Sequence, residues 1–252
     1  MPSDLTGKRI IITGAATGIG RSTAIMAAEC NAEAIAIFDV ADTEAQDTAN
    51  TINSATGSTI AKCWHVDIAD RASVEGGVAA AVQWMQGIDV LLHFAGILHG
   101  AFEPIESFEE VTWDRVLDTN LKGTYLIAKQ VVTHMNNQPN GGTIITTASG
   151  AGVTAGSSSY AYGASKGAVH GFTMVMQRHI DMSKIRVQDI VPGRTRTPMV
   201  LENLRQQLEI TGDQAAYDAA IANLADPEDV ARIATFMASD AAKVMRGPVF
   251  TR

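Results

Sequence analysis

The sequence predicts an α/β fold: a Rossmann-type, doubly wound parallel β-sheet with helices on both faces, in one domain over residues 1–252. Short apolar runs alternate with longer helical stretches along the whole chain, as in repeated strand–helix units. A glycine-rich turn follows the first apolar run and opens the first helical stretch. No linker rich in Pro or Ser and no internal repeat divides the chain, and right-handed crossovers then give one sheet.

Four strands and three helices are expected in the first part of the chain. The first apolar run, at 9–13, has no polar alternation, which is typical of a strand that is buried on both faces. The apolar runs predict strands at 9–13, 34–39, 59–66 and 88–94. The helical stretches between them are 18–30, 43–55 and 71–85.

The second part continues the pattern and adds an irregular segment. Two long helices are expected at 111–136 and 158–182, with strands at 142–147, 185–191 and 248–250. The stretch at 194–224 is expected to be helical, polar and irregular, and it is interpreted as a flap over a substrate. A last helix should begin after Asp226, since an N-cap aspartate followed by Pro227 is a common helix start.

The composition limits the kinds of partner that the protein is expected to bind. The net charge is −8 and the isoelectric point is near 5.2, which argues against nucleic acid, because phosphate binding needs a basic face. No stretch approaches the roughly 20 apolar residues of a membrane span, and the N-terminus lacks a signal pattern. The cysteines, Cys30 and Cys63, match no metal-binding or disulfide spacing. A cytoplasmic enzyme without a metal is therefore expected.

The glycine-rich turn has the spacing of a dinucleotide-binding loop. Gly14 allows a tight turn, Gly18 allows close approach of a pyrophosphate, and Gly20 allows the helix to pack on the strand. Thr17 and Ile19 lie between them, where the start of a helix offers free N–H groups to phosphate. Glycine also marks ordinary turns, but the strand–turn–helix context favours the nucleotide.

Two aspartates follow the next two strands. Asp39 stands nineteen residues after Gly20, where a carboxylate accepts hydrogen bonds from a ribose diol. The same charge repels a 2′-phosphate, so NAD is expected rather than NADP. Asp67 is placed to accept the adenine amino group, with Ile68 beside it. Each aspartate has the alternative of capping the following helix.

Tyr162 and Lys166 are four residues apart and therefore share one helix face. A lysine ammonium near a phenol favours the phenolate, so the pKa of Tyr162 should fall into the range of a general acid or base. Tyr160 has Ala164 four residues later and no such partner. A solvated helix face is the alternative for the pair.

In this order and spacing, the motifs resemble the short-chain dehydrogenase/reductase family of the classical type over nearly the whole chain. The motifs that carry the resemblance are 13–20, Asp39, Asp67, Ala95-Gly96, Asn120, Ser149, Tyr162-x-x-x-Lys166 and Pro192-Gly193. The resemblance implies hydride transfer between NAD(H) and a secondary alcohol or ketone. The alternative is a catalytically silent protein of the same fold that senses NAD or acts as a scaffold.

The resemblance also implies residue roles. Tyr162 is the expected acid/base, Ser149 orients the substrate oxygen, Lys166 lowers the tyrosine pKa and binds ribose, and Asn120 holds a water. The expected cofactor-binding residues are Gly14, Thr17, Gly18, Ile19, Gly20, Asp39, Asp67, Ile68, Ala95, Gly96, Tyr162, Lys166, Pro192, Gly193, Thr195 and Thr197. Members are usually dimers or tetramers, which implies a homo-oligomer packed through helices at 111–136 and 158–182.

Departures from the family pattern and two arginines complete the predictions. His93-Phe94 stands where the family commonly has Asn-Asn, and we interpret His93 as a core histidine rather than a catalytic one. The family's asparagine before Pro-Gly and its Asp-Gly-Gly tail are also absent. Arg194 and Arg196 flank the nicotinamide-side loop, where either a substrate anion or solvent is their expected partner.

Overall fold

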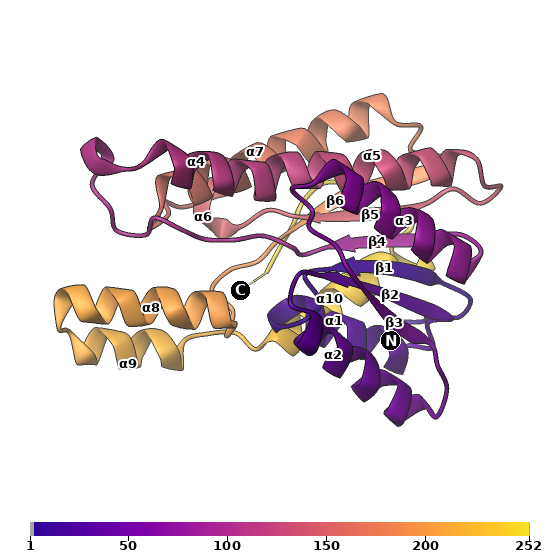
Figure 1. Cartoon of the computed structure of the whole chain (residues 1–252), viewed down its shortest axis with the longest axis horizontal. Coiled ribbons are helices and arrows are strands. Elements are labelled where there is room, and N and C mark those ends of the chain that lie inside the picture. Colours follow the sequence, from indigo (N-terminus) through magenta and orange to yellow (C-terminus); the bar gives the residue numbers. More distant parts are fainter. Residues whose placement is uncertain (1–2, 252) are drawn as a thin grey trace.

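Seven parallel strands form one sheet in the order β3-β2-β1-β4-β5-β6-β7 (Figure 1). This structure, a computed structural model, describes residues 3–251. The strands are β1 Arg9–Thr13, β2 Ala34–Asp39, β3 Ala61–His65, β4 Val90–His93, β5 Gly142–Thr147, β6 Ile185–Val191 and β7 Val249–Phe250. The predicted fold class is confirmed, and each predicted strand lies within two residues of its expected place.

Helices cover both faces of the sheet. The α-helices are α1 Gly18–Glu29, α2 Asp42–Thr56, α3 Arg71–Met85, α4 Glu110–Leu117, α5 Gly123–Asn136, α6 Gly150–Val153, α7 Tyr160–His179, α8 Pro198–Thr211, α9 Gln214–Ala222 and α10 Pro227–Ala238. Two 3₁₀ turns, η1 Ile105–Ser107 and η3 Asp240–Ala242, and a π-helical turn, η2 Asp118–Lys122, complete the order. Helices α1, α2 and α10 lie on one face, and α3, α4, α5 and α7 on the other (Figure 1).

The uninterrupted apolar strands are explained by this double cover. Successive side chains of a strand point to opposite faces. Accordingly, Ile10 and Ile12 join the core beneath α1, α2 and α10, while Ile11 joins the core beneath α3 and α5. All three side chains are fully buried, so neither face of β1 tolerates a polar residue without a partner.

The strand order reverses between β1 and β4, which creates a crevice at the carboxyl edge of the sheet. β1 pairs with β2 on one side and with β4 on the other, all parallel. The chain therefore leaves β1 and β4 in opposite directions, and the loops after them diverge. In open α/β sheets, ligands bind at such a switch point.

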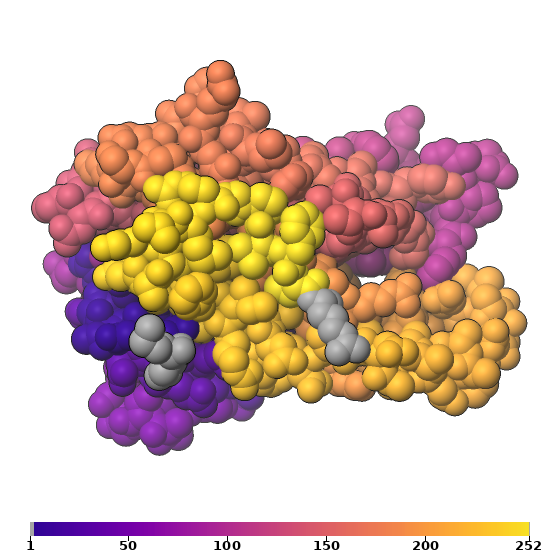
Figure 2. Space-filling model, turned by 180° about the vertical axis from the view of Figure 1, so that it is seen from behind, coloured from indigo at the N-terminus to yellow at the C-terminus, as the bar shows by residue number. Residues whose placement is uncertain are grey.

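Four local features add to the sequence-based expectation or differ from it. The helix expected at 111–136 is interrupted by η2, and the short helix α6 follows β5. The expected flap consists of α8 and α9, which project from the body as a separate lobe (Figures 1 and 2). Asp226 occupies the N-cap position of α10, but its side chain makes no capping bond there.

None of the helices within residues 3–251 is long and apolar enough to cross a membrane.

Candidate active site

A cavity of about 1230 Å³ opens at the carboxyl edge of the sheet, bounded by the loops after the first six strands and by α8. It gathers residues that are far apart in the sequence. All predicted site residues line it except Asn120, which is fully buried just behind the wall. The two halves of the predicted site, nucleotide-binding and catalytic, therefore belong to one continuous cavity.

The glycine-rich turn is packed too closely for side chains. Gly14 has a φ of 68°, and a Cβ there would lie 2.7 Å from the backbone nitrogen of Ala95. A Cβ on Gly20 would lie 2.1 Å from the carbonyl oxygen of Gly14. Thr17 is the N-cap of α1 but makes no side-chain cap bond. The first N–H groups of α1 thus remain available to an anion, and the turn fits a dinucleotide diphosphate.

Asp39 is held at the end of β2 by three backbone donors. Its Oδ2 accepts from the amide of Ala16 at 2.9 Å, which ties it to the glycine-rich turn. Its Oδ1 accepts from the amides of Val40 and Ala41 at 2.8 and 3.1 Å. These bonds precede α2 and fix the carboxylate at the cavity wall. An oriented carboxylate in this place suits the diol of a ribose.

Asp67 lines the same cavity and does not cap α3. Its Oδ1 accepts from the amide of Ala69 at 2.9 Å. Asp70 is the cap of α3, where it accepts from the amide of Ser73 at 2.7 Å. The capping alternative for Asp67 is therefore wrong, and its carboxylate is exposed next to Ile68 at the cavity wall.

The loop after β6 closes the cavity from the side of the flap. Pro192 and Gly193 line it, and Thr195 is buried. Thr197 caps α8 by accepting from the amide of Val200 at 3.3 Å. The methyl group of Thr197 also faces Gly18, where a Cβ would approach it at 3.1 Å. This loop and the glycine-rich turn therefore face each other across the cavity.

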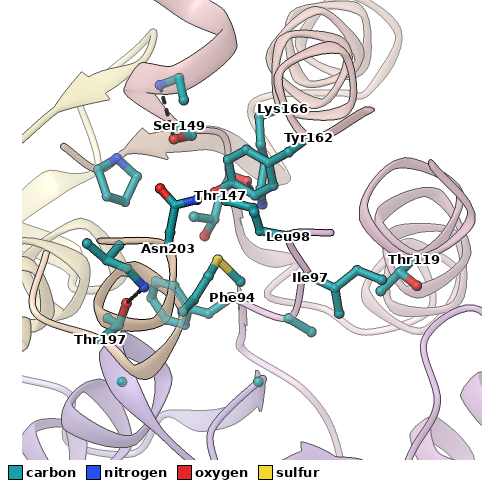
Figure 3. A pocket seen from close by; sticks show the side chains of 18 of the residues that line it. Phe94, Ile97, Leu98, Thr119, Thr147, Ser149, Tyr162, Lys166, Thr197 and Asn203 are labelled. Atoms are coloured by element: carbon teal, nitrogen blue, oxygen red, sulfur yellow. Dashed lines mark hydrogen bonds between the residues drawn. The ribbon is translucent and has the colours of Figure 1, made fainter. Parts of the chain in front are cut away.

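Tyr162, Lys166 and Ser149 converge on one end of the cavity (Figure 3). Ser149 ends the loop after β5, and its Oγ accepts from the amide of Ala151 at 3.2 Å. Tyr162 and Lys166 come from successive turns of α7. The ammonium of Lys166 donates to the carbonyl of Thr147 at 2.9 Å and lies 5.9 Å from the centre of the tyrosine ring.

Burial dominates the electrostatics of this pair. Burial lowers the pKa of Lys166 from 10.5 to about 8, because a charged amine loses its hydration. Burial also raises the pKa of Tyr162, and the Ser149 hydroxyl acts in the opposite direction. The expected lowering of the tyrosine pKa by Lys166 is not found, because burial outweighs the other contributions and the ammonium is directed at the Thr147 carbonyl.

Asn120 lies in the π-helical turn η2 and locks the neighbouring segments together. Its Nδ2 donates to the carbonyl of Ile97 and to the Oγ of Ser165, both at 2.9 Å. Its Oδ1 accepts from the amide of Ile97 at 2.8 Å. The mid-helix asparagine is thus fully bonded, and its backbone adopts the wider π-helical turn.

Several alternatives are resolved by the geometry. Tyr160 is exposed and packs against Phe108, with ring centres 5.6 Å apart. Ser159 caps α7 by accepting from the amide of Tyr162 at 3.3 Å. Arg194 lines the cavity. Arg196 instead donates to the carbonyl of Ile221 at 3.0 Å, away from the lining, which removes it as a substrate ligand.

Residues of the flap and of the loop after β4 complete the wall at this end of the cavity. Asn203 of α8 donates through Nδ2 to the Oγ of Ser158 at 2.9 Å, so the flap is linked to the segment before α7. It faces the Tyr162 end of the cavity (Figure 3). Apolar wall residues also come from the loop after β4 and from α8: Leu98, Phe102, Met199, Val200 and Leu204. No motif marks them, because only the fold brings these segments together. Among residues 3–251, no His, Cys, Asp and Glu side chains are grouped to hold a metal ion.

Known proteins are similar to this chain in sequence. The chain is 32% identical over 246 residues to a 3-oxoacyl-(acyl-carrier-protein) reductase of Thermotoga maritima, covering 97% of this chain and 96% of the relative. It is 32% identical over 257 residues to 3beta-hydroxysteroid dehydrogenase 2 of Eggerthella lenta, covering 98% and 94%.

Solved structures share the fold of this chain. The structure of levodione reductase superposes with a TM-score of 0.89 at 28% identity, covering 98% of this chain and 96% of that one. A 3-ketoacyl-(acyl-carrier-protein) reductase from Brucella melitensis, solved with NADH, gives 0.85 at 27% identity, with 98% of each chain covered. The family model for short chain dehydrogenase matches residues 8–208. The chain therefore belongs to the short-chain dehydrogenase/reductase family of oxidoreductases.

Proposed function

We propose that this protein catalyses reversible hydride transfer between NAD(H) and a secondary alcohol or ketone, with Tyr162 as the general acid/base. The observation that carries the proposal is the convergence of Ser149, Tyr162 and Lys166 at one end of a cavity whose other end carries Asp39 and the glycine-rich turn. A proton donor and a nucleotide cradle in one cavity are what carbonyl reduction requires.

NAD is the proposed coenzyme; when bound it would donate the hydride to a ketone in its reduced form and accept the hydride of an alcohol in its oxidised form. Gly14, Gly18 and the start of α1 would hold the diphosphate, Asp39 the adenosine ribose, and Asp67 the adenine. The Asp39 carboxylate, already oriented by three amides, would repel a 2′-phosphate. The NADH complex of the Brucella melitensis relative supports this choice.

Proton transfer is assigned to the three converging side chains. Ser149 hydrogen-bonds the substrate oxygen, and Tyr162 donates its phenolic proton to that oxygen or removes a proton from an alcohol. The ammonium of Lys166, with a pKa of about 8, is mostly charged at pH 7 and stabilises the phenolate that forms. Asn120, bonded to Ile97 and Ser165, holds the backbone where a water would connect Lys166 to solvent.

The cavity walls indicate the substrate class. The substrate end is bounded by apolar residues, Leu98, Phe102 and Val200, and by small ones, Ala151 and Ala155. Arg194 is the arginine of the flap loop that remains at the wall, and it is exposed. We therefore propose an uncharged, largely apolar substrate, such as a cyclic ketone or its alcohol, because the buried cation at this end, Lys166, is assigned to the phenolate and the other wall residues there are apolar or small.

A substrate panel tests the proposal. Absorbance at the NADH band would be followed with NADH or NADPH and a series of cyclic ketones, steroid ketones, 3-oxoacyl esters and keto acids. We expect turnover with NADH and neutral ketones, and much lower turnover with keto acids. Tight NADH binding without turnover on any member would instead support the silent, NAD-sensing alternative.

A further inference from the structure

His93 is a buried titratable side chain that the proposed mechanism does not use. It ends β4 and is 2% exposed. Its Nδ1 lies 2.7 Å from the Oγ1 of Thr13, at the end of β1. Its Nε2 lies 2.9 Å from the Oγ1 of Thr124, at the start of α5. The ring therefore bridges the glycine-rich side of the cavity and the helix that carries Asn120.

The neighbouring hydrogen bonds determine the direction of each contact. The hydroxyl of Thr124 has one proton, which it donates to the carbonyl of Asn120 at 2.6 Å. Its oxygen must therefore accept from Nε2–H of His93. Burial and the nearby Lys166 lower the pKa of His93 to about 3, so the ring is neutral. Nδ1 is then an acceptor for the hydroxyl of Thr13, whose oxygen accepts from the amide of Ala95 at 3.2 Å.

We propose that His93, fixed as the Nε2–H tautomer, is a positioning residue that connects the glycine-rich turn to the Asn120 carbonyl through one directional chain of hydrogen bonds. The chain runs from the Ala95 amide through Thr13, His93 and Thr124 to Asn120. Each of Ala95, Thr13, His93 and Thr124 donates one proton to the next group, and the Asn120 carbonyl accepts the last one. This inference rests on the proposed function for its kinetic consequence but not for its geometry.

The chain reaches both sides of the proposed reaction centre. Thr13 directly precedes Gly14, and Ala95 directly precedes Gly96. Gly96 lies against the far end of the chain, since a Cβ there would be 3.1 Å from the Oδ1 of Asn120 and 3.3 Å from the Nζ of Lys166. A shift of His93 would therefore move the coenzyme turn and the Asn120–Lys166 wall relative to each other.

The π-helical turn explains why Thr124 takes part. In an α-helix the carbonyl of Asn120 would pair with the amide four residues later, but a π-helical turn moves the pairing one residue further. The hydroxyl of Thr124 supplies a donor from the i+4 position instead. The orientation of this carbonyl thus depends on a side chain that His93 holds in place.

The tautomer gives a test that needs no turnover. ¹⁵N-edited NMR of the histidine rings at pH 7, assigned by comparison with His93→Asn, should show Nε2 protonated and Nδ1 unprotonated for His93. An Nδ1–H tautomer would overturn the proposal, because Thr124 would have no proton to accept. A charged ring would also overturn it, because Nδ1 could then no longer accept from the hydroxyl of Thr13. An inactive wild-type protein would sink the proposed function but leave this result intact.

Variants of Thr124 test the kinetic role. Thr124→Val removes the link, and Thr124→Ser keeps the hydroxyl. Thr235→Val is the matched control, since Thr235 is equally buried and donates within α10, on the opposite face of the sheet. We expect Thr124→Val to lower kcat by about tenfold with KM and the NADH dissociation constant little changed. Thr124→Ser should recover most of the rate. Equal rates for Thr124→Val and Thr235→Val would overturn the positioning role.

A double variant tests whether His93 acts through Thr124. Asparagine at 93 is long enough to accept from Thr13 but too short to reach Thr124. His93→Asn should therefore lower kcat as much as Thr124→Val does, and combining the two should lower it no further, as residues acting in series do. Multiplication of the two losses would show independent effects and contradict a single chain.

Discussion

Replacing Lys166 with methionine should stabilise the coenzyme-free protein at pH 7 while it removes turnover. Lys166 is 4% exposed and has no carboxylate partner among its hydrogen bonds, which go to the Thr147 carbonyl. A buried ammonium without a counter-ion costs free energy. Methionine has a similar length, is apolar, and fits an irregular space. Function and stability are therefore opposed at this position.

The size of this stabilisation follows from the pKa of Lys166. A lysine pKa that falls from 10.5 to about 8 on folding corresponds to a cost of about 3.4 kcal/mol, at about 1.36 kcal/mol per pH unit. The lost bond to Thr147 costs about 1.5–3 kcal/mol for a charged donor. The net gain in the free energy of unfolding is about 0.5–2 kcal/mol. For a chain of this size, that raises Tm by about 1–4 °C.

The sign of the pH dependence gives the stronger test. The folded state binds fewer protons than the unfolded state between the folded pKa of about 8 and 10.5, so wild-type stability from this group rises with pH in that window. The burial cost is fully present below pH 8, and by pH 9.5 it has fallen by about 2 kcal/mol. The advantage of Lys166→Met over wild type should therefore vanish near pH 9.5.

Thermal unfolding without coenzyme, at matched protein concentrations and at pH 7 and 9.5, measures this difference. Lys243→Met is the control, because Lys243 is exposed and its variant should differ from wild type by the same small amount at both values. A Tm difference between Lys166→Met and wild type that is the same at pH 7 and 9.5 would refute the reasoning, as would a less stable variant at pH 7.

Four further variants test other parts of the structure. Asp39→Asn should shift the kcat/KM ratio toward NADPH by about tenfold or more, measured with both coenzymes; an unchanged ratio would exclude Asp39 as the discriminator. Gly20→Ala should weaken NADH binding and lower Tm, because its Cβ would clash with the carbonyl of Gly14. Gly76→Ala, in open space on α3, should raise stability by up to about 1 kcal/mol. Arg186→Met should lower stability by about 3 kcal/mol, with kcat retained, because the buried guanidinium bonds carbonyls at the end of α10; a retained Tm would contradict this.

Features that depend on local spacing and residue type could be predicted from the sequence. Strands buried on both faces, such as β1, leave uninterrupted apolar runs, and the glycine-rich turn follows from steric demands that only glycine meets. The position of Tyr162 and Lys166 on one face of α7 follows from helical spacing. These features depend on residues that are close together in the chain.

Features that depend on tertiary contacts could not be predicted from the sequence. The π-helical turn around Asn120 arises from bonds to Ile97 and Ser165, which belong to other segments. The neutral state of His93 depends on its complete burial. Likewise, the direction of the Tyr162 pKa shift depends on burial, which raises it, and on the hydrogen bond with Ser149, which lowers it, and spacing alone contains no information about burial.

Replacing Tyr162 with phenylalanine tests the central claim most directly. The substitution removes one hydroxyl from the cavity and keeps the ring. Turnover of the best ketone with NADH should fall by about 10²–10⁴-fold, the usual contribution of a general acid. NADH affinity, measured by fluorescence titration, should stay within about twofold of wild type. A Tyr162→Phe enzyme with near wild-type turnover would contradict the assignment of Tyr162 as the acid/base.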